Sequence, residues 1–185
     1  EIVEQVLAVE RWNVEEGRAE GQPTQHATRN TDAPSPTAKS PVPNSPPRLV
    51  SNLVIMGMGE PLANYEAVAE SLRQLLDPKR HGIGARHVSV STVGIPKGIE
   101  RFAADFPQIN LAVSLHAAED ALRTRLVPAN KAFPLSELAR ALERYLGSSR
   151  RKVLLEYALL SGVNDRLADA DALVAFVRRL GRPEL

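Results

Sequence analysis

The stretch from residue 87 to residue 116, HVSVSTVGIPKGIERFAADFPQINLAVSLH, decides the fold. Its two ends, residues 87–93 and 110–116, are short runs with recurring Val, Leu and Ala that predict β-strands. Between them Ile99, Phe102 and Phe106 recur at helical spacing, which predicts an amphipathic helix. A strand, a helix and a second strand in this order form a βαβ unit, in which the two strands run parallel.

The same alternation continues on both sides of this unit. Further strands are predicted at residues 49–55 and 152–159, and further helices at residues 64–77, 120–125, 134–146 and 168–180. Four strands that alternate with helices indicate an α/β fold with a parallel sheet. This pattern fits both an open doubly wound sheet and a segment of a (βα) barrel, and periodicity alone does not choose between them.

Residues 13–48 have a different composition from the rest of the 185-residue chain. Seven of its 14 prolines lie between Pro23 and Pro47, among many Ser, Thr and Asn residues. With so few apolar side chains, burial could not offset the entropy cost of ordering, so a disordered Pro/Ser-rich insertion is predicted. A Pro-rich interaction motif at residues 43–46 is the alternative. Residues 1–12 are predicted to end a packed helix, and residues 49–185 to form the folded core.

Composition excludes several classes of protein. The chain carries 23 Lys and Arg against 22 Asp and Glu, which excludes a polycationic arm or an acidic tail. No run approaches the roughly 18 apolar residues of a membrane span, so no membrane association is expected. The chain has no cysteine and therefore no thiol nucleophile and no thiolate-held metal or iron–sulfur site. Because it begins with Glu1 rather than Met, we expect a piece of a longer protein.

Polar residues follow each predicted strand. In parallel βα architectures ligands bind at the carboxyl ends of the strands, in the loops that follow. These ends are residues 57–61, 91–94, 114–116 and 161–165. Taken singly, each has an ordinary interpretation as a turn, a capping hydroxyl or a structural histidine. The chain contains no P-loop, no dinucleotide-binding glycine fingerprint and no Ser–His–Asp set of diagnostic spacing. The prediction of a site therefore rests on the clustering of these polar residues at one end of the sheet.

Five segments, in order, resemble one family. They are MGMGEPLANY at 56–65, VSVSTVGIP at 88–96, NLAVSLHA at 110–117, LRTRLVPANK at 122–131 and EYALLSGVND at 156–165. Together they resemble the radical-SAM RNA methyltransferases that act on adenine C2, the RlmN-like family. The resemblance covers residues 49–180, and residues 1–12 resemble the helix that follows the family's cluster loop.

The resemblance implies a partial (βα) barrel of the radical-SAM type that uses S-adenosylmethionine and a [4Fe–4S] cluster. Gly59 and Glu60 would hold the methionine amino end, Ser91 would contact polar groups of the cofactor, and Ser114, Leu115 and His116 would line the same site. The implied reaction is methylation of adenine C2 in 23S rRNA, and also in tRNA. An aromatic C–H carbon of this kind is not nucleophilic, so radical chemistry must be carried by a cofactor.

The cluster cysteines and the methyl-carrying cysteine of the family are absent from this chain. The resemblance therefore implies a central fragment with no catalytic residue and no metal ligand of its own, the cluster ligands lying outside it. Two alternatives remain open: a relative that methylates adenine C8, and an inactive RNA-binding or assembly protein that retains the barrel.

The expected partners are 23S rRNA and tRNA. Candidate RNA contacts are Arg123, Arg125 and Lys131, which follow the third predicted strand. The alternative for such residues is a solvated loop or helix end. A monomer is expected, in the cytoplasm or, for a eukaryotic protein, in an organelle.

Overall fold

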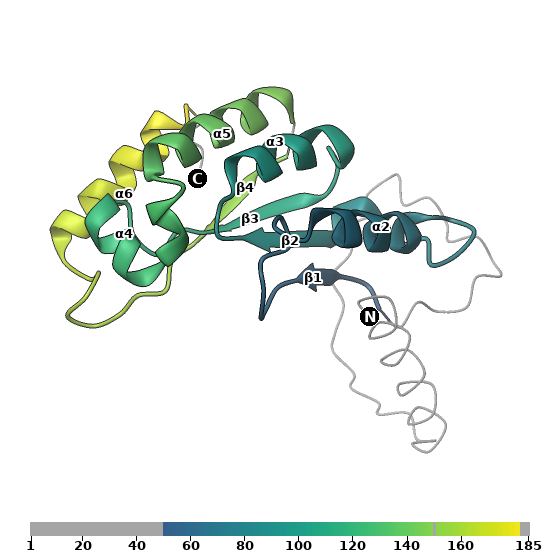
Figure 1. Cartoon of the computed structure of the whole chain (residues 1–185), viewed down its shortest axis with the longest axis horizontal. Coiled ribbons are helices and arrows are strands. Elements are labelled where there is room, and N and C mark those ends of the chain that lie inside the picture. Colours follow the sequence, from purple (N-terminus) through teal and green to yellow (C-terminus); the bar gives the residue numbers. More distant parts are fainter. Residues whose placement is uncertain (1–49, 150, 182–185) are drawn as a thin grey trace, which may run out of the picture. The chain divides into compact units, whose positions relative to one another are not determined.

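The computed structural model describes residues 50–149 and 151–181 (Figure 1). The chain divides into two compact units, residues 1–51 and residues 52–185, and every helix and strand described here lies in the second. The expectations of a helix end at residues 1–12 and of a disordered insertion at residues 13–48 lie outside the described residues. Within the described ranges, no helix is long and apolar enough to cross a membrane.

The core contains one sheet of four parallel strands in the order β1-β2-β3-β4 (Figure 1). The strands are β1 Leu53–Ile55, β2 Val88–Thr92, β3 Asn110–Ser114 and β4 Val153–Glu156. This confirms the parallel α/β sheet expected from the sequence. The strand order follows the chain without reversal, whereas a doubly wound sheet reverses at its switch point. A barrel segment is therefore the alternative that the topology favours.

Helices alternate with these strands. They are α2 Tyr65–Leu76, α3 Pro96–Asp105, α4 Asp120–Leu126, α5 Leu135–Ser148 and α6 Leu167–Arg179, with short 3-10 helices at Ala85–His87 and Pro128–Lys131. Helices α3 and α5 pack against each other on one face of the sheet (Figure 1). The apolar stripes predicted from the sequence thus provide the helical side of the core.

The two faces of the sheet carry different side chains. Val88 and Val90 of β2 are fully buried, with 0% of their surface exposed, on the face that the helices cover. Successive side chains of a strand point to opposite faces, so Ser91 points to the other face. Ser91 pairs with Ala112, and Ala112 pairs with Leu154, which is 54% exposed. Ser91, Ser114 and Glu156 thus lie on the face opposite the helices, whereas Thr92 is on the same face as Val90.

All four predicted strands are longer than the strands observed, and the difference is largest for the first and the last. Of the run predicted at 49–55, the described part from residue 50 onward forms a strand over Leu53–Ile55, and the strand predicted at 152–159 ends at Glu156. Beyond Glu156 the side chain of Asn164 takes the place of the strand-to-strand hydrogen bonds. Its Nδ2 donates to the carbonyl oxygen of Ala158 at 2.8 Å, and its Oδ1 accepts from the backbone N–H of Leu160 at 2.7 Å. A side-chain amide thus satisfies the backbone where strand pairing stops.

Candidate functional site

The Glu60 carboxylate joins the ends of β1 and β2. Its Oε1 accepts hydrogen bonds from the Thr92 hydroxyl at 2.6 Å and from the backbone N–H of Leu62 at 3.0 Å. Its Oε2 accepts from the backbone N–H of Val93 at 2.8 Å. Three donors hold one half-buried carboxylate in a single orientation at the carboxyl end of the sheet. A fixed anion of this kind suits the binding of an amine or a hydroxyl group.

The loop before Glu60 needs its glycines for conformation. Gly57 has φ +131° and Gly59 has φ +106°, values that side-chain-bearing residues rarely adopt. A Cβ atom added at either glycine would meet no atom within 4 Å. The backbone next to Glu60 is therefore open on this side, and a ligand can approach it closely.

A second carboxylate, that of Glu156, lies between two serines. Its Oε2 accepts from the hydroxyl of Ser91 at 3.2 Å and from the hydroxyl of Ser114 at 3.1 Å. The three residues come from β2, β3 and β4, so this contact joins three neighbouring strands. Sequence analysis identified both serines and missed Glu156 as a site residue, although it begins the motif at 156–165.

Leu115 and His116 continue β3 into the site through their backbones. Both N–H groups donate to the carbonyl oxygen of Glu156, at 3.0 and 3.2 Å. His116 then adopts φ +56°, which is uncommon for a residue other than glycine. This turn places the imidazole beside the segment that follows β4.

The His116 ring has a defined proton position. Its Nδ1 lies 3.1 Å from the backbone nitrogen of Ala158, which can only donate, so the neutral ring carries its proton on Nε2. Burial lowers the pKa of His116 below its usual value, the Glu156 carboxylate acts in the opposite direction, and the Arg123 guanidinium adds to the lowering. His116 is therefore neutral at pH 7 and presents one N–H donor.

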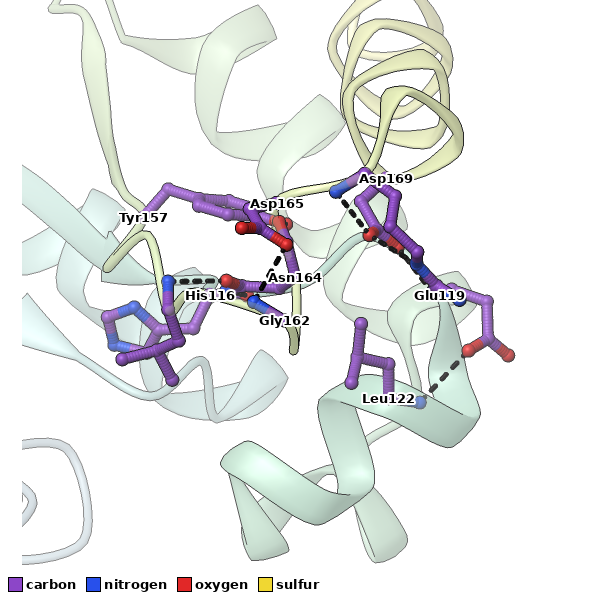
Figure 2. A network of polar contacts seen from close by, with 10 residues as sticks. His116, Glu119, Leu122, Tyr157, Gly162, Asn164, Asp165 and Asp169 are labelled. Carbon is purple, nitrogen blue, oxygen red and sulfur yellow. Dashed lines mark hydrogen bonds and ion pairs between the residues drawn. The ribbon is translucent and has the colours of Figure 1, made fainter.

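The loop after β4 is tied to His116 by the buried Asn164 side chain, as Figure 2 shows. Asn164 Nδ2 donates to the carbonyl oxygen of His116 at 2.8 Å. Nearby, the Asp165 carboxylate accepts from the backbone N–H of Gly162 at 3.0 Å. The loop at 161–165, predicted as the fourth strand end, is thus hydrogen-bonded to His116 at the third strand end.

Arg123 is placed differently from the RNA contact expected from the sequence. Its side chain is 0% exposed. Its guanidinium donates to the carbonyl oxygens of Val93, Leu115 and Ser114, at 2.7, 3.1 and 3.2 Å respectively. Burial lowers the pKa of Arg123, and Asp120 partly opposes that effect. A guanidinium enclosed by backbone carbonyls stabilises the ends of β2 and β3, and the structure corrects the expectation that it contacts RNA.

Arg125 and Lys131 remain exposed, as an RNA contact requires. Arg125 lies on α4, and Lys131 ends the 3-10 helix Pro128–Lys131. Both could meet phosphates without desolvating a buried charge. Of the three basic residues identified in the sequence, these two keep that role as a hypothesis.

The polar groups at the strand ends fit S-adenosylmethionine and do not fit an iron–sulfur cluster. Glu60 and Glu156 offer fixed acceptors, His116 offers a donor, and the glycine loop offers open backbone. The 185-residue chain has no cysteine to supply thiolates. Among the described residues, no group of three or more His, Asp or Glu side chains could hold a metal ion.

Comparison with known proteins gives relatives for most of the folded core. No family model matches the chain. It is 50% identical over 129 residues to a protein of Chloroflexus aurantiacus and over 129 residues to one of Moorella thermoacetica, both named "Probable dual-specificity RNA methyltransferase RlmN". Each match covers 70% of this chain, but only 34% and 36% of the relatives. The chain therefore spans about a third of the length of these curated relatives.

A solved structure supports the same relationship. The crystal structure of a radical SAM methyltransferase from Sphaerobacter thermophilus superposes with a TM-score of 0.68 at 46% sequence identity. The match covers 71% of this chain and 38% of that one. At this identity, the sheet and the four strand ends described here belong to the same architecture as that methyltransferase.

Proposed function

Since the chain belongs to the RlmN-like family of radical SAM methyltransferases, we propose that it forms the cofactor-binding part of an enzyme that methylates RNA. The observation that carries the proposal is the joining of four strand ends by two fixed carboxylates, Glu60 and Glu156, beside an open glycine loop. Ligands of parallel βα folds bind at this end of the sheet.

In this proposal Glu60 holds the amino end of S-adenosylmethionine. Three hydrogen-bond donors keep its carboxylate in place, so little reorganisation is needed when an ammonium group arrives. Gly57 and Gly59 let the amino-acid part of the cofactor approach the backbone. The bound cofactor supplies a methyl group and radical chemistry, which an aromatic carbon without nucleophilic character requires.

Ser91 and the segment from Ser114 to His116 line the remainder of the same site. Arg123 keeps the two strand ends in register by binding the carbonyl oxygens of Val93 and Ser114. The thiolates of a [4Fe–4S] cluster would have to come from residues outside these 185, because this chain contains no cysteine.

The finer assignment is adenine C2 of 23S rRNA, with tRNA as a second substrate. It is supported by the sequence motifs and by relatives named for dual-specificity RNA methylation. Arg125 and Lys131 are proposed to contact the RNA. We further propose that the protein is a monomer. It would act where such RNA is modified, in the cytoplasm or, for a eukaryotic protein, in an organelle.

A chimera tests the function directly. Residues 52–180 would replace the matching segment of the Chloroflexus aurantiacus relative. The relative would supply the other two thirds of the chimera. We expect the chimera to methylate adenine in RNA, and mass spectrometry of the nucleosides separates C2 from C8 products. Glu60→Ala in the chimera should abolish methylation, whereas Glu137→Gln on the exposed surface of α5 should leave it unchanged.

The alternative function is an inactive RNA-binding or assembly protein that retains the barrel. A chimera that folds and binds RNA but does not methylate it would support this alternative. The 185-residue chain alone should bind no stoichiometric iron after reconstitution with iron and sulfide, and should methylate no RNA. Robust methylation by the chain alone would contradict the mechanism proposed here.

A further inference from the structure

The amino ends of the four parallel strands meet at the edge of the sheet opposite the candidate site (Figure 1). Side chains at this edge form a hydrogen-bonded row. Nδ1 of His87, before β2, lies 3.1 Å from Oδ1 of Asn52, before β1. Nδ2 of Asn110, at the start of β3, donates to the carbonyl oxygen of Arg86 at 3.0 Å, and its Oδ1 accepts from the guanidinium of Arg151, before β4. The row holds Arg86, His87 and Arg151 along one edge.

The amino edge, formed by Asn52 and residues 77–87, 106–110 and 151–152, carries an excess of positive charge. Its acidic side chain is Asp77, and its five basic side chains are Lys79, Arg80, Arg86, Arg151 and Lys152. Within residues 50–149 and 151–181, Arg80 is the one of these five that forms an ion pair, at 3.8 Å from Asp77. The other four cations therefore have no ion-pair partner in the described part of the chain.

Arginines on the outer helices are neutralised by comparison. Arg101 of α3, Arg144 of α5 and Arg179 of α6 each form an ion pair with a glutamate of a neighbouring helix. Charges paired in this way contribute little to the potential around the molecule, whereas unpaired charges of one sign add up. The amino edge thus concentrates a positive potential and attracts a polyanion.

Arg151 supplies an independent observation that points to a ligand. Its side chain is half-buried, and its Nε, which can only donate, is enclosed without a hydrogen-bond partner among residues 50–149 and 151–181. A buried donor without an acceptor is unfavourable, so a partner from outside the described residues would stabilise it. Guanidinium groups bind phosphate oxygens through two parallel N–H groups, which makes a phosphate a suitable partner.

The side chains of the amino edge favour a phosphate backbone over a protein surface. Among the described residues, every large hydrophobic side chain that is exposed lies outside this edge. Protein interfaces bury an apolar core with aromatic side chains, which the amino edge does not supply. Lys and Arg beside Asn side chains are typical of contacts with phosphates and sugars in nucleic acids.

We propose that the amino edge binds the phosphate backbone of RNA through Lys79, Arg86, Arg151 and Lys152. The choice of RNA rests on the proposed function. Strands β2 and β3 have 5 residues each, so at about 3.3 Å per residue the amino edge lies about 17 Å from the carboxyl ends of the strands. The phosphates bound here therefore belong to a segment of the RNA other than the one that carries the reacting adenine.

The experiment measures RNA binding by the full 185-residue chain. Fluorescence anisotropy follows a fluorescein-labelled RNA hairpin at several KCl concentrations, and polyglutamate serves as a second, phosphate-free polyanion. The test variant Arg86→Gln/Lys152→Gln and the matched control Lys97→Gln/Arg140→Gln each lose one Arg and one Lys. All four side chains are exposed, and thermal unfolding establishes that each variant is folded.

We expect the slope of log K against log salt concentration to decrease by about 1.5 in Arg86→Gln/Lys152→Gln, because each lost phosphate contact removes about 0.7–0.9. The slope of Lys97→Gln/Arg140→Gln should stay close to that of wild type. Arg151→Lys keeps the charge and loses the planar fork, so it should weaken RNA binding about threefold and leave the slope nearly unchanged.

Four other outcomes would overturn the proposal. Equal decreases of the slope in the two double variants would mean that net charge alone governs binding. If Arg125→Gln/Lys131→Gln weakens RNA binding and Arg86→Gln/Lys152→Gln does not, this inference is wrong and the proposed function stands. If Arg86→Gln/Lys152→Gln loses polyglutamate and retains RNA, the amino edge binds an acidic protein instead. A wild-type chain that binds no RNA would contradict this inference together with the proposed RNA contacts of Arg125 and Lys131.

Discussion

Arg123 and Asn130 are hydrogen-bonded to each other inside the fold, with 2.8 Å between Nη1 and Oδ1. Both side chains are almost completely enclosed, at 0% and 3% exposure. Asn130 in turn donates from Nδ2 to the Asp120 carboxylate at 2.9 Å. The pair thus connects α4 and the 3-10 helix after it to the two central strand ends that Arg123 binds.

Replacement of Arg123 should destabilise the chain. In Arg123→Met the carbonyl oxygens of Val93 and Ser114 lose the guanidinium as a donor, while that of Leu115 keeps the N–H of Ala117 at 2.7 Å. Each buried polar group left unsatisfied costs about 1–3 kcal/mol. We expect a total loss of about 3 kcal/mol or more in the free energy of unfolding, measured by urea denaturation. Arg123→Lys should fall between, because an ammonium reaches fewer of these acceptors.

The control for this prediction is Arg140→Met on the exposed side of α5, which should change the free energy of unfolding by less than about 0.5 kcal/mol. A similarly small effect of Arg123→Met would show that the enclosed guanidinium does not stabilise the strand ends.

Thr92 should affect cofactor affinity through Glu60. Its hydroxyl donates to Glu60 Oε1 at 2.6 Å and accepts from the backbone N–H of Gly94 at 3.0 Å. Thr92→Val removes both bonds and leaves the carboxylate with two of its three donors, so we expect binding of S-adenosylhomocysteine to weaken about fivefold to tenfold. Thr92→Ser keeps the hydroxyl and should bind nearly as wild type. Equal weakening in both variants would argue for a packing effect instead.

Two helical glycines should respond oppositely to alanine. A Cβ at Gly98 of α3 would lie 2.7 Å from Leu62 Cβ, so Gly98→Ala should destabilise the fold by about 1–3 kcal/mol. A Cβ at Gly147 of α5 would meet nothing within 4 Å, so Gly147→Ala should stabilise it by up to about 1 kcal/mol, the ordinary helix preference. Thermal unfolding compares the two variants, and a stabilising Gly98→Ala would contradict the close approach of α3 to the Glu60 loop.

His116 should make stability depend on pH below neutrality. Its pKa in the folded state is lowered by burial, so the unfolded chain binds the proton more readily. The stabilisation from neutral His116 is thus complete above the unfolded pKa of about 6.5 and is lost as the pH falls through the lower folded value. Protonation also removes the Nδ1 acceptor of the Ala158 N–H.

His116→Asn tests this assignment. Asparagine tolerates a positive φ and does not titrate, so the variant keeps the turn and loses the proton uptake. We expect its stability to fall less steeply than that of wild type between pH 6.5 and the acid range, measured by urea denaturation at several pH values. Parallel curves for the two proteins would assign the pH dependence to other groups.

Local patterns predicted the elements, while the partners of individual side chains could not be predicted. Apolar runs and helical periodicity identified every strand and the five α-helices that the structure describes. Arg123 was expected to contact RNA because it follows the third predicted strand, and the structure shows it buried instead. Its acceptors include Val93, 30 residues away in the chain, and no local pattern carries that information.

Glu156 illustrates the same limit. The pattern placed it within a strand at 152–159, but the hydroxyls that it binds lie 65 and 42 residues away. Strand order and register bring them together, and both are settled by packing of the whole sheet. The residues of a site can therefore be identified singly from a sequence, whereas the contacts between them depend on the topology.

The pairing of Ser114 with Glu156 also determines which kinds of genetic change the site can survive. Side chains alternate between the two faces of a strand, so one residue inserted or deleted within β4 before Glu156 would turn its carboxylate toward the helices, into the row of Val113 and Leu155. The same change at residues 78–82, between α2 and β2, alters only a connection and leaves the strand pairing unchanged. Insertions and deletions are thus tolerated in the connections and not within the strands, whatever residue is inserted or deleted.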